Sequence, residues 1–240
     1  MCNRRSVSTF FLLLFVFCVY GGEAYAVTDR CPRHQVVTEL KAKLKKTKKF
    51  RASISEINDY FDNHDRSSGT VLAFVSYGGK SLYIDTRFSF GLKSIGHGQY
   101  CVMLNGVKSY FYAAPSIVMP KDFKKSSCEY KLILKHEKRH LKALYNYHKK
   151  YTGKYAAYQG RIARDVPIFL PVTSEEDAEI VREKIRGYFS DKFSYQIQKS
   201  FVELGAAQAK IDSPQEYRGV GMALDRCAID TNLVFGAPHH

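Results

Sequence analysis

The sequence lacks several features that would assign it to common classes of protein. Its 240 residues contain no C-x-x-C pair, which argues against a zinc site built from cysteines. After residue 20 no segment is apolar enough to span a bilayer, and there are no internal repeats or low-complexity linkers. There is no recognisable nucleic-acid-binding motif, so we expect no nucleic-acid partner. The 17 Tyr and 16 Phe residues are ample for a packed core and exclude intrinsic disorder.

Residues 1–26 have the pattern of a secretory signal peptide. Arg4 and Arg5 precede an apolar run over 9–20, and Ala24-Tyr25-Ala26 is an A-x-A cleavage pattern. The alternative is an uncleaved membrane anchor, but a spanning helix needs about 20 apolar residues and this run is shorter. The sequence therefore predicts an exported protein, periplasmic or secreted, with no transmembrane segment in the mature chain, 27–240.

Cysteine usage agrees with export. Two of the six cysteines fall in the signal peptide, and the other four remain in the mature chain. In an oxidising compartment four cysteines predict two disulfide bonds, with three possible connectivities that the sequence cannot rank. We favour Cys31–Cys101 and Cys128–Cys227, which would tie the start of the mature chain to the sheet and the motif helix described below to the C-terminus.

Positive charge is in large excess. The chain has 37 Lys and Arg against 23 Asp and Glu, a formal charge of +14 that becomes +13 when Arg4, Arg5 and Glu23 leave with the signal peptide. Much of the excess lies between Lys41 and Lys49. Such a run is commonly a solvated face. The alternative is attraction to an anionic surface, such as acidic envelope polymers, lipid headgroups or acidic peptides.

The first half of the mature chain predicts a sheet. Residues 70–119 contain short runs rich in Val, Ile, Phe and Tyr, broken by Gly-Gly, Gly-His-Gly and Asn-Gly, which is typical of antiparallel strands. Asn105-Gly106 is the strongest hairpin signal among them. Residues 27–67 are polar and basic, and their alternation is too weak to assign.

The second half, residues 126–225, predicts helices. One covers 128–151, is capped by Ser126 or Ser127 and ends at Gly153. A second covers about 174–210 and has acids in its first turn, and a short third begins at Pro214. Strands followed by helices indicate an α+β fold, which we expect to form a single domain over 27–240.

The first helix carries the motif H-E-x-x-H at residues 136–140, the signature of zinc proteases. On a helical wheel His140 and Glu137 lie about 40° and about 100° from His136, on the apolar side, whereas the lysines face away. Histidines at i and i+4 can share one metal ion, and a buried glutamate is costly without a partner. We predict that His136 and His140 bind Zn²⁺ and that Glu137 activates water as a general base. The alternative is two core histidines hydrogen-bonded to the backbone.

A third protein ligand is not identified by the motif. His148 is 12 residues from His136, about 18 Å along a straight helix, and no glycine turn intervenes. Glu203 interrupts the apolar stripe of the second helix, and His97 lies in Gly96-His97-Gly98 between two strands. Both residues stay open as ligands. The alternatives are that Glu203 is a partly exposed helix glutamate and that His97 is a plain turn histidine.

Taken together, these patterns resemble a family of uncharacterised exported proteobacterial proteins of the zincin-like kind. The similar segments are Cys31-Pro32, Tyr100-Cys101-Val102, Ser127-Cys128-Glu129-Tyr130 running into the motif, and 212–217 before Cys227. The resemblance implies a zinc-dependent hydrolase in which His136, His140 and Glu137 have the roles given above.

The sequence therefore predicts an exported metallopeptidase that acts on peptide or amide bonds in the cell envelope. An extended substrate could add to the sheet at the edge of a strand within 107–119. The alternative is a non-catalytic basic protein of the envelope or periplasm, with a binding or structural role on a degenerate zincin scaffold. A site without its third ligand would fit that alternative.

Overall fold

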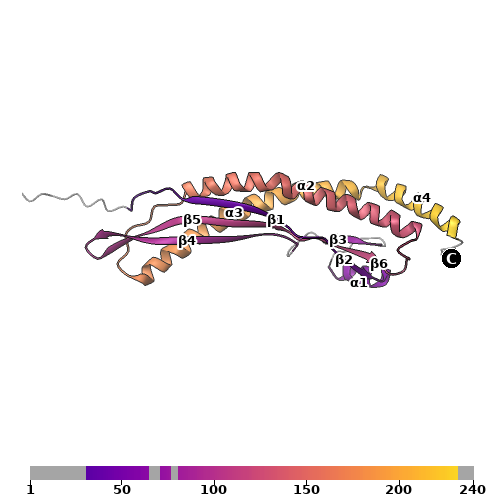
Figure 1. Ribbon diagram of the computed structural model, residues 1–240, viewed down its shortest axis with the longest axis horizontal. Coiled ribbons are helices and arrows are strands. Elements are labelled where there is room, and N and C mark those ends of the chain that lie inside the picture. The colour runs from indigo at the N-terminus through magenta and orange to yellow at the C-terminus, as the bar shows by residue number, and fades with distance from the viewer. Residues whose placement is uncertain (1–30, 65–70, 77–80, 232–240) are drawn as a thin grey trace, which may run out of the picture.

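The structure, a computed structural model, describes residues 31–64, 71–76 and 81–231. The predicted signal peptide, 1–26, lies outside these residues. Two three-stranded sheets follow one another along an elongated molecule, and long helices run beside both (Figure 1). The predicted α+β class is confirmed. None of the helices in the described part of the chain combines the length and hydropathy needed to cross a membrane.

The described strands and helices alternate little along the chain. In order they are β1 (Val37–Leu44), β2 (Lys48–Ala52), α1 (Ile54–His64), β3 (Phe74–Ser76), β4 (Leu82–Gly96), β5 (Gln99–Ala113), β6 (Ser116–Pro120), α2 (Cys128–Arg164), α3 (Glu175–Ile211) and α4 (Pro214–Thr231).

The strands within 70–119 pair antiparallel, as predicted, but each sheet also contains a parallel pair with a strand from the basic segment before residue 70. In the large sheet the central strand is β5, which pairs parallel with β1 and antiparallel with β4. In the small sheet β6 is central, pairs parallel with β2 and antiparallel with β3. The parallel pairs were missed because β1 and β2 lie in the basic segment, whose exposed lysines hide the strand alternation. Since β5 and β6 are both central, the expected substrate edge within 107–119 is also wrong.

Asn105-Gly106 is not a hairpin turn but lies inside β5. The β4–β5 turn is formed by Gly96, His97 and Gly98, which all have positive φ (95°, 52° and 70°). Asn105 is the extra residue of a β-bulge, because the register shifts between Ser89 and Phe90. A Cβ at Gly106 would meet Ser89 Oγ at 2.9 Å and the carbonyl oxygen of Val37 at 3.3 Å. This glycine therefore serves the close approach of three strands.

The helix α2 is longer than predicted and packs on both sheets. Ser127 caps it by accepting a hydrogen bond from the Tyr130 amide, but the helix continues through Gly153 to Arg164. Its N-terminal half packs Ile133 on Ile117 and Met119 of the small sheet. Its C-terminal half packs on the large sheet, where the buried residues include Phe111, Leu144 and Tyr155.

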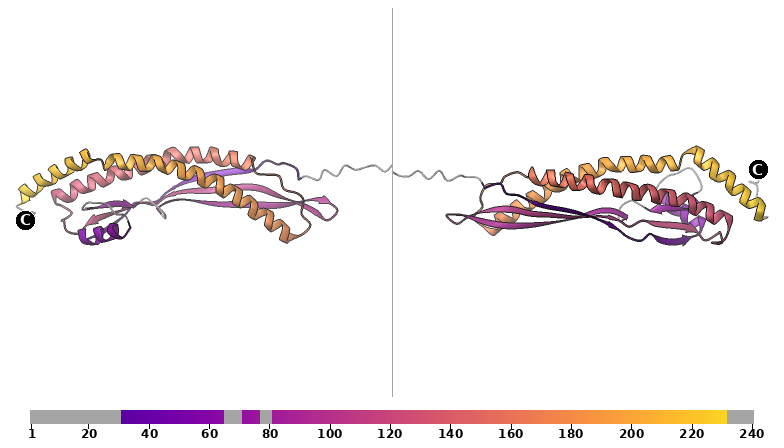
Figure 2. Two further views of the ribbon diagram at one scale, coloured as in Figure 1. Left: turned by 180° about the vertical axis from the view of Figure 1, so that it is seen from behind. Right: turned by 45° about the horizontal axis from the view of Figure 1, so that its top comes forward.

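The helix α3 agrees with the prediction and begins after its cap, Ser174. It crosses the face of the large sheet that α2 also covers (Figure 2). Before it, the connection runs extended, and Val172 pairs with Tyr100 near the β4–β5 turn. As a result α3 begins beyond the end of α2 rather than beside it.

Two disulfide bonds connect distant parts of the chain. Cys31 pairs with Cys101 across 70 residues, and Cys128 pairs with Cys227 across 99 residues, as the sequence analysis favoured. The second bond fastens α4 to the first residue of α2. Two disulfides are compatible with an exported protein.

Candidate metal centre

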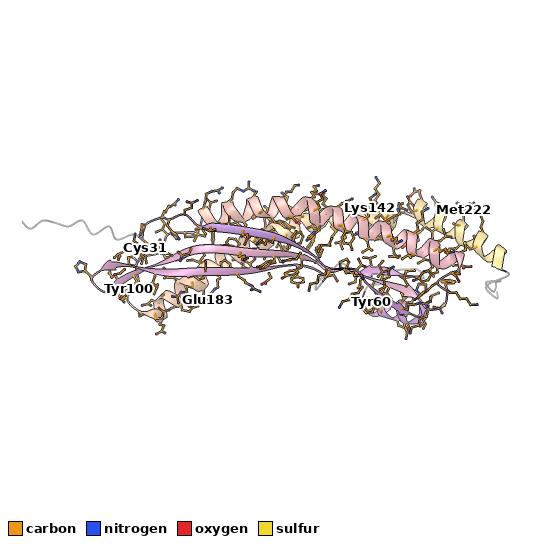
Figure 3. All side chains as sticks on the ribbon, viewed as in Figure 1. Cys31, Tyr60, Tyr100, Lys142, Glu183 and Met222 are labelled. Atoms are coloured by element: carbon orange, nitrogen blue, oxygen red, sulfur yellow. A yellow bond between two sulfur atoms is a disulfide. The ribbon has the colours of Figure 1, made fainter. Side chains whose placement is uncertain are left out.

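The side of α2 that carries the H-E-x-x-H motif faces the protein interior, as its periodicity predicts. Glu137 and His140 are buried at 5% and 6% exposure, and the His136 side chain is 11% exposed. The lysines of the helix point away from this face, and Lys142 shows their direction (Figure 3). The motif is therefore not part of a solvated helical surface.

Asp212 completes a cluster with the two histidines. It is the C-cap of α3, directly after Ile211, and Ser213 alone separates it from Pro214, the first residue of α4. Its Oδ1 lies 3.2 Å from His136 Nε2 and 3.0 Å from His140 Nε2, and these two nitrogens are 3.1 Å apart. His136, His140 and Asp212 are the one group of three in the described residues whose ligand atoms could hold a metal ion together.

The spacing of these three atoms matches one face of a tetrahedral coordination sphere. Nitrogen and oxygen ligands at zinc distances and tetrahedral angles are about 3.3 Å apart. The three distances in the cluster are 3.0, 3.1 and 3.2 Å. Only a slight expansion would therefore bring all three into contact with a common cation.

Gln208 orients His140 from one turn before Asp212 on α3. Its Oε1 accepts a hydrogen bond from His140 Nδ1, and its Nε2 donates to the backbone carbonyl of His140 at 3.3 Å. A proton held on Nδ1 leaves the lone pair of neutral His140 on Nε2, which faces the cluster. This is the arrangement in which a second side chain fixes a metal-binding tautomer. His136 Nδ1, in contrast, is buried without a hydrogen-bond partner in the described residues.

The ionisation of the cluster is strongly coupled. Burial would raise the pKa of Asp212, but hydrogen bonds from His136 and His140 outweigh it and hold this pKa well below its usual range. Burial would lower the pKa of His140, but hydrogen bonds to Asp212 and Gln208 and the nearby carboxylates raise it. The cluster thus favours an ionised Asp212 beside a protonated His140, and a metal cation would compete with that proton.

Glu137 stands beside the cluster without belonging to it. Burial raises the pKa of its carboxyl to about 7, and the positive charge of His140 and His136 only partly opposes this. A carboxyl with a pKa near neutrality can both accept and return a proton under physiological conditions. Its place next to the histidines fits the catalytic role predicted for it.

A cleft of about 180 Å³ opens onto His136 and Glu137. One wall is α4, which contributes Tyr217, and the ring of Tyr217 lies 6.0 Å from that of His136. Burial, the charge of Asp212 and a hydrogen bond to it raise the pKa of Tyr217, so its hydroxyl stays protonated as a donor. An ion pair of 2.6 Å between Arg139 and Glu216 holds the start of α4 against α2.

Neither of the two residues left open as third ligand reaches the centre. Glu203 pairs with Lys150 and accepts a hydrogen bond of 2.5 Å from the Tyr151 hydroxyl. His97 is in the β4–β5 turn, at the other end of the large sheet. His148, excluded on geometry, hydrogen-bonds the Phe111 carbonyl at 2.9 Å. Asp212, which the structure brings to the two histidines, was not among the candidates that the sequence suggested.

Comparisons with protein-family models, with curated proteins and with solved structures found no match to this chain. The centre is therefore interpreted from its own geometry and chemistry.

Proposed function

We propose that the protein is an exported zinc-dependent hydrolase, a metallopeptidase of the zincin-like kind that cleaves peptide or amide bonds. One observation carries this proposal: two histidine nitrogens and one carboxylate oxygen converge within 3.2 Å beside a buried glutamate. Three protein ligands with a fourth position left for water or substrate are typical of catalytic zinc sites. Two disulfides support export, and peptides or peptide-bearing envelope polymers are the proposed substrates.

Each residue of the centre has a distinct role in this proposal. His136, His140 and Asp212 hold the ion, which when bound polarises the carbonyl and lowers the pKa of water. Glu137 accepts the proton of the attacking water and passes it to the leaving nitrogen as the C–N bond breaks. Gln208 keeps His140 in its binding tautomer, and Tyr217 offers a hydroxyl donor at the edge of the cleft.

Metal content tests the site. The exported protein, purified with its disulfides formed, is expected to contain about one zinc per chain by mass spectrometry. The ion should be lost in His136→Ala, His140→Ala and Asp212→Asn. Glu203→Gln is the matched control, because it also removes a carboxylate from α3 but lies outside the cluster. A folded wild-type protein that takes up no zinc when zinc is added would refute the proposal.

Hydrolysis tests the chemistry. Glu137→Gln should retain zinc, because Glu137 is not in the ligand set, but lose about 10²- to 10⁴-fold in rate on a peptide substrate. An unchanged rate in this variant would show that Glu137 is not the general base. If Glu137→Gln lost both zinc and activity, Glu137 would be assigned to zinc binding instead of to proton transfer.

A second candidate function, binding of an acidic polysaccharide, is favoured by the outer face of the large sheet. The register places Lys41 beside Tyr110, and Lys43 and Tyr83 beside Tyr112. We call this surface the basic tyrosine face; it consists of Lys41, Lys43, Lys45, Tyr83, Arg87, Lys108, Tyr110 and Tyr112, with the acids Glu39 and Asp85 among them.

The rings of this face support cations rather than offer free stacking surfaces. Lys43, Arg87 and Lys108 all lie within 5.7 Å of the centre of the Tyr110 ring. Lys45 lies 5.4 Å from the centre of the Tyr112 ring. Nucleic-acid binding by stacking needs uncovered rings, so a polyanion recognised by charge fits better. This function requires no catalysis and corresponds to the non-catalytic alternative.

Binding to polygalacturonate, with neutral dextran as a comparison, tests this second function. A lysine near an anionic surface contributes about a factor of five to binding at low salt. Removing three lysines of the face should therefore weaken binding about a hundredfold. The variant combines Lys43→Ala, Lys45→Ala and Lys108→Ala, and the control combines Lys131→Ala, Lys142→Ala and Lys149→Ala. Equal loss in both would mean that only net charge matters, and exclusive binding to oligonucleotides or anionic vesicles would replace the polysaccharide.

A further inference from the structure

The cleft beside the candidate metal centre is mostly apolar, although the centre itself is polar. Apart from His136, Glu137 and Tyr217, its walls are almost entirely aliphatic. They come from three elements, namely the segment before β3, the N-terminal half of α2, and α4. The residues that form them are Val71, Leu72, Ala73, Ile133, Val220 and Leu224.

Two of the three walls are fixed. Ile133 and Ala73 are buried in the core under the small sheet. The Asn58 side chain holds the adjacent backbone, since it accepts a hydrogen bond from the Val71 amide at 2.8 Å and donates to the Val71 carbonyl at 3.0 Å. The third wall, α4, is held by the Cys128–Cys227 bond and by the ion pair of Arg139 with Glu216.

The size of the cleft selects its occupant. An apolar cavity of about 150 Å³ takes a benzene ring, whereas a site for a whole drug-sized ligand needs about 300 Å³ or more. At about 180 Å³ the cleft fits one side chain of the size of Leu or Phe. Such a side chain would enter between α2 and α4 and leave its backbone at His136 and Glu137.

We infer that this cleft is a specificity pocket that binds a large apolar side chain of the residue next to the scissile amide. The inference rests on the proposed hydrolase function and names its substrate class: peptides with Leu, Phe or a similar residue at the cleavage site. Charged side chains are disfavoured there, because the aliphatic walls offer no partner for a desolvated charge.

Gly221 provides a direct test, since it lines the cleft and a Cβ built on it meets no atom within 4 Å. In Gly221→Leu the new side chain has room to occupy the pocket. Gly219→Leu is the matched control, because a Cβ there also meets no atom within 4 Å but the residue does not line the cleft. Both changes replace a glycine inside the same helix, so their effects on helix stability should be similar.

The first measurement uses fluorogenic peptides that differ only at the position next to the cleaved bond. The wild-type protein should prefer Leu or Phe over Gly by about tenfold or more in kcat/KM. Gly221→Leu should lose this preference while cleaving the Gly peptide at the wild-type rate, and Gly219→Leu should keep it. Cleavage that depends on Glu137 but ignores side-chain size, or identical behaviour of the two variants, would overturn the inference.

A second measurement separates the pocket from the chemistry. N-acetyl-leucinamide, titrated into methyl-labelled protein, should shift the NMR signals of Ala73, Ile133 and Leu224, and N-acetyl-glycinamide should not. Gly221→Leu should abolish the shifts and Gly219→Leu should retain them. If no peptide is hydrolysed but these shifts occur, the hydrolase proposal fails and the apolar pocket stands. If hydrolysis occurs without these shifts, the pocket fails and the hydrolase stands.

Discussion

The two disulfides should contribute almost equally to stability but very differently to the centre. In the chain-entropy model, stabilisation depends on the length of the closed loop, and the loops span 99 and 70 residues. These lengths correspond to about 4.7 and about 4.4 kcal/mol at 25 °C. The paired replacements Cys128→Ala with Cys227→Ala, and Cys31→Ala with Cys101→Ala, should therefore lower the free energy of unfolding by similar amounts.

Local order should separate the two variants. The helix α4 has 18 residues, packs mainly against α2, and exposes Met222 and Tyr217. Most helical stability in proteins comes from packing, the two glycines of α4 weaken it further, and the exposed ion pair of Arg139 with Glu216 adds at most about 1 kcal/mol. Loss of the Cys128–Cys227 bond should thus let α4 open before the rest of the protein unfolds.

Chemical denaturation and hydrogen exchange check this prediction together. Denaturation should give nearly equal destabilisation for the two variants. Exchange read by mass spectrometry should show lost protection in 214–227 only for the Cys128 and Cys227 variant. Equal loss of protection in α4 for both variants would refute the local role of this bond. A difference of several kcal/mol between the variants would refute the loop-length reasoning.

Three further predictions concern other parts of the fold. Gln159→Leu should cost about 1–3 kcal/mol in urea denaturation, because this buried side chain donates to the carbonyls of Glu39 (3.1 Å) and Val107 (2.7 Å) and joins α2 to two strands. The hydrogen bond that Tyr151 donates to Glu203 raises the pKa of Tyr151 to about 12. Glu203→Gln should therefore return the pKa of Tyr151 toward its ordinary value in an NMR titration of labelled tyrosine. Gly106→Ala should destabilise the protein by about 1–3 kcal/mol through overpacking. Gly153→Ala should stabilise it by up to about 1 kcal/mol, because a Cβ there meets open space. Thermal unfolding at a higher temperature for Gly106→Ala than for Gly153→Ala would contradict this geometry.

Periodicity in the sequence predicted α2 and the inward direction of its motif, but not the length of the helix. Gly153 was expected to end it, since glycine costs about 1 kcal/mol in a helix interior. Tyr155 and Gln159 lie beyond that point and are almost fully buried against the large sheet and α3. Their burial outweighs the cost of one glycine, and such tertiary packing cannot be read from a local stretch of sequence.

Asp212 was missed because a local stretch of sequence does not show how far α3 is displaced along its axis relative to α2. Counted from the connection between α2 and α3, Glu203 is as far along α3 as His136 is along α2. The structure pairs His136 with Asp212 instead, nine residues later, or about 13 Å along the helix. The extended connection, which pairs Val172 with Tyr100, shifts α3 by this distance. Gln208 and Asp212 are four residues apart and share one face of the helix, and this pair of polar residues is the sequence signal that could have indicated Asp212.

The continuity of α2 across both sheets fixes the distance between the candidate centre and the basic tyrosine face. His148 touches the backbone of Phe111, between the two tyrosines that lie at the centre of the basic tyrosine face, and His136 lies 12 residues earlier in the same helix. The two places are thus separated by at least about 18 Å, the length of five or six residues of extended chain. A polymer long enough to reach both places would need at least this length between the segment on the face and the segment at the centre.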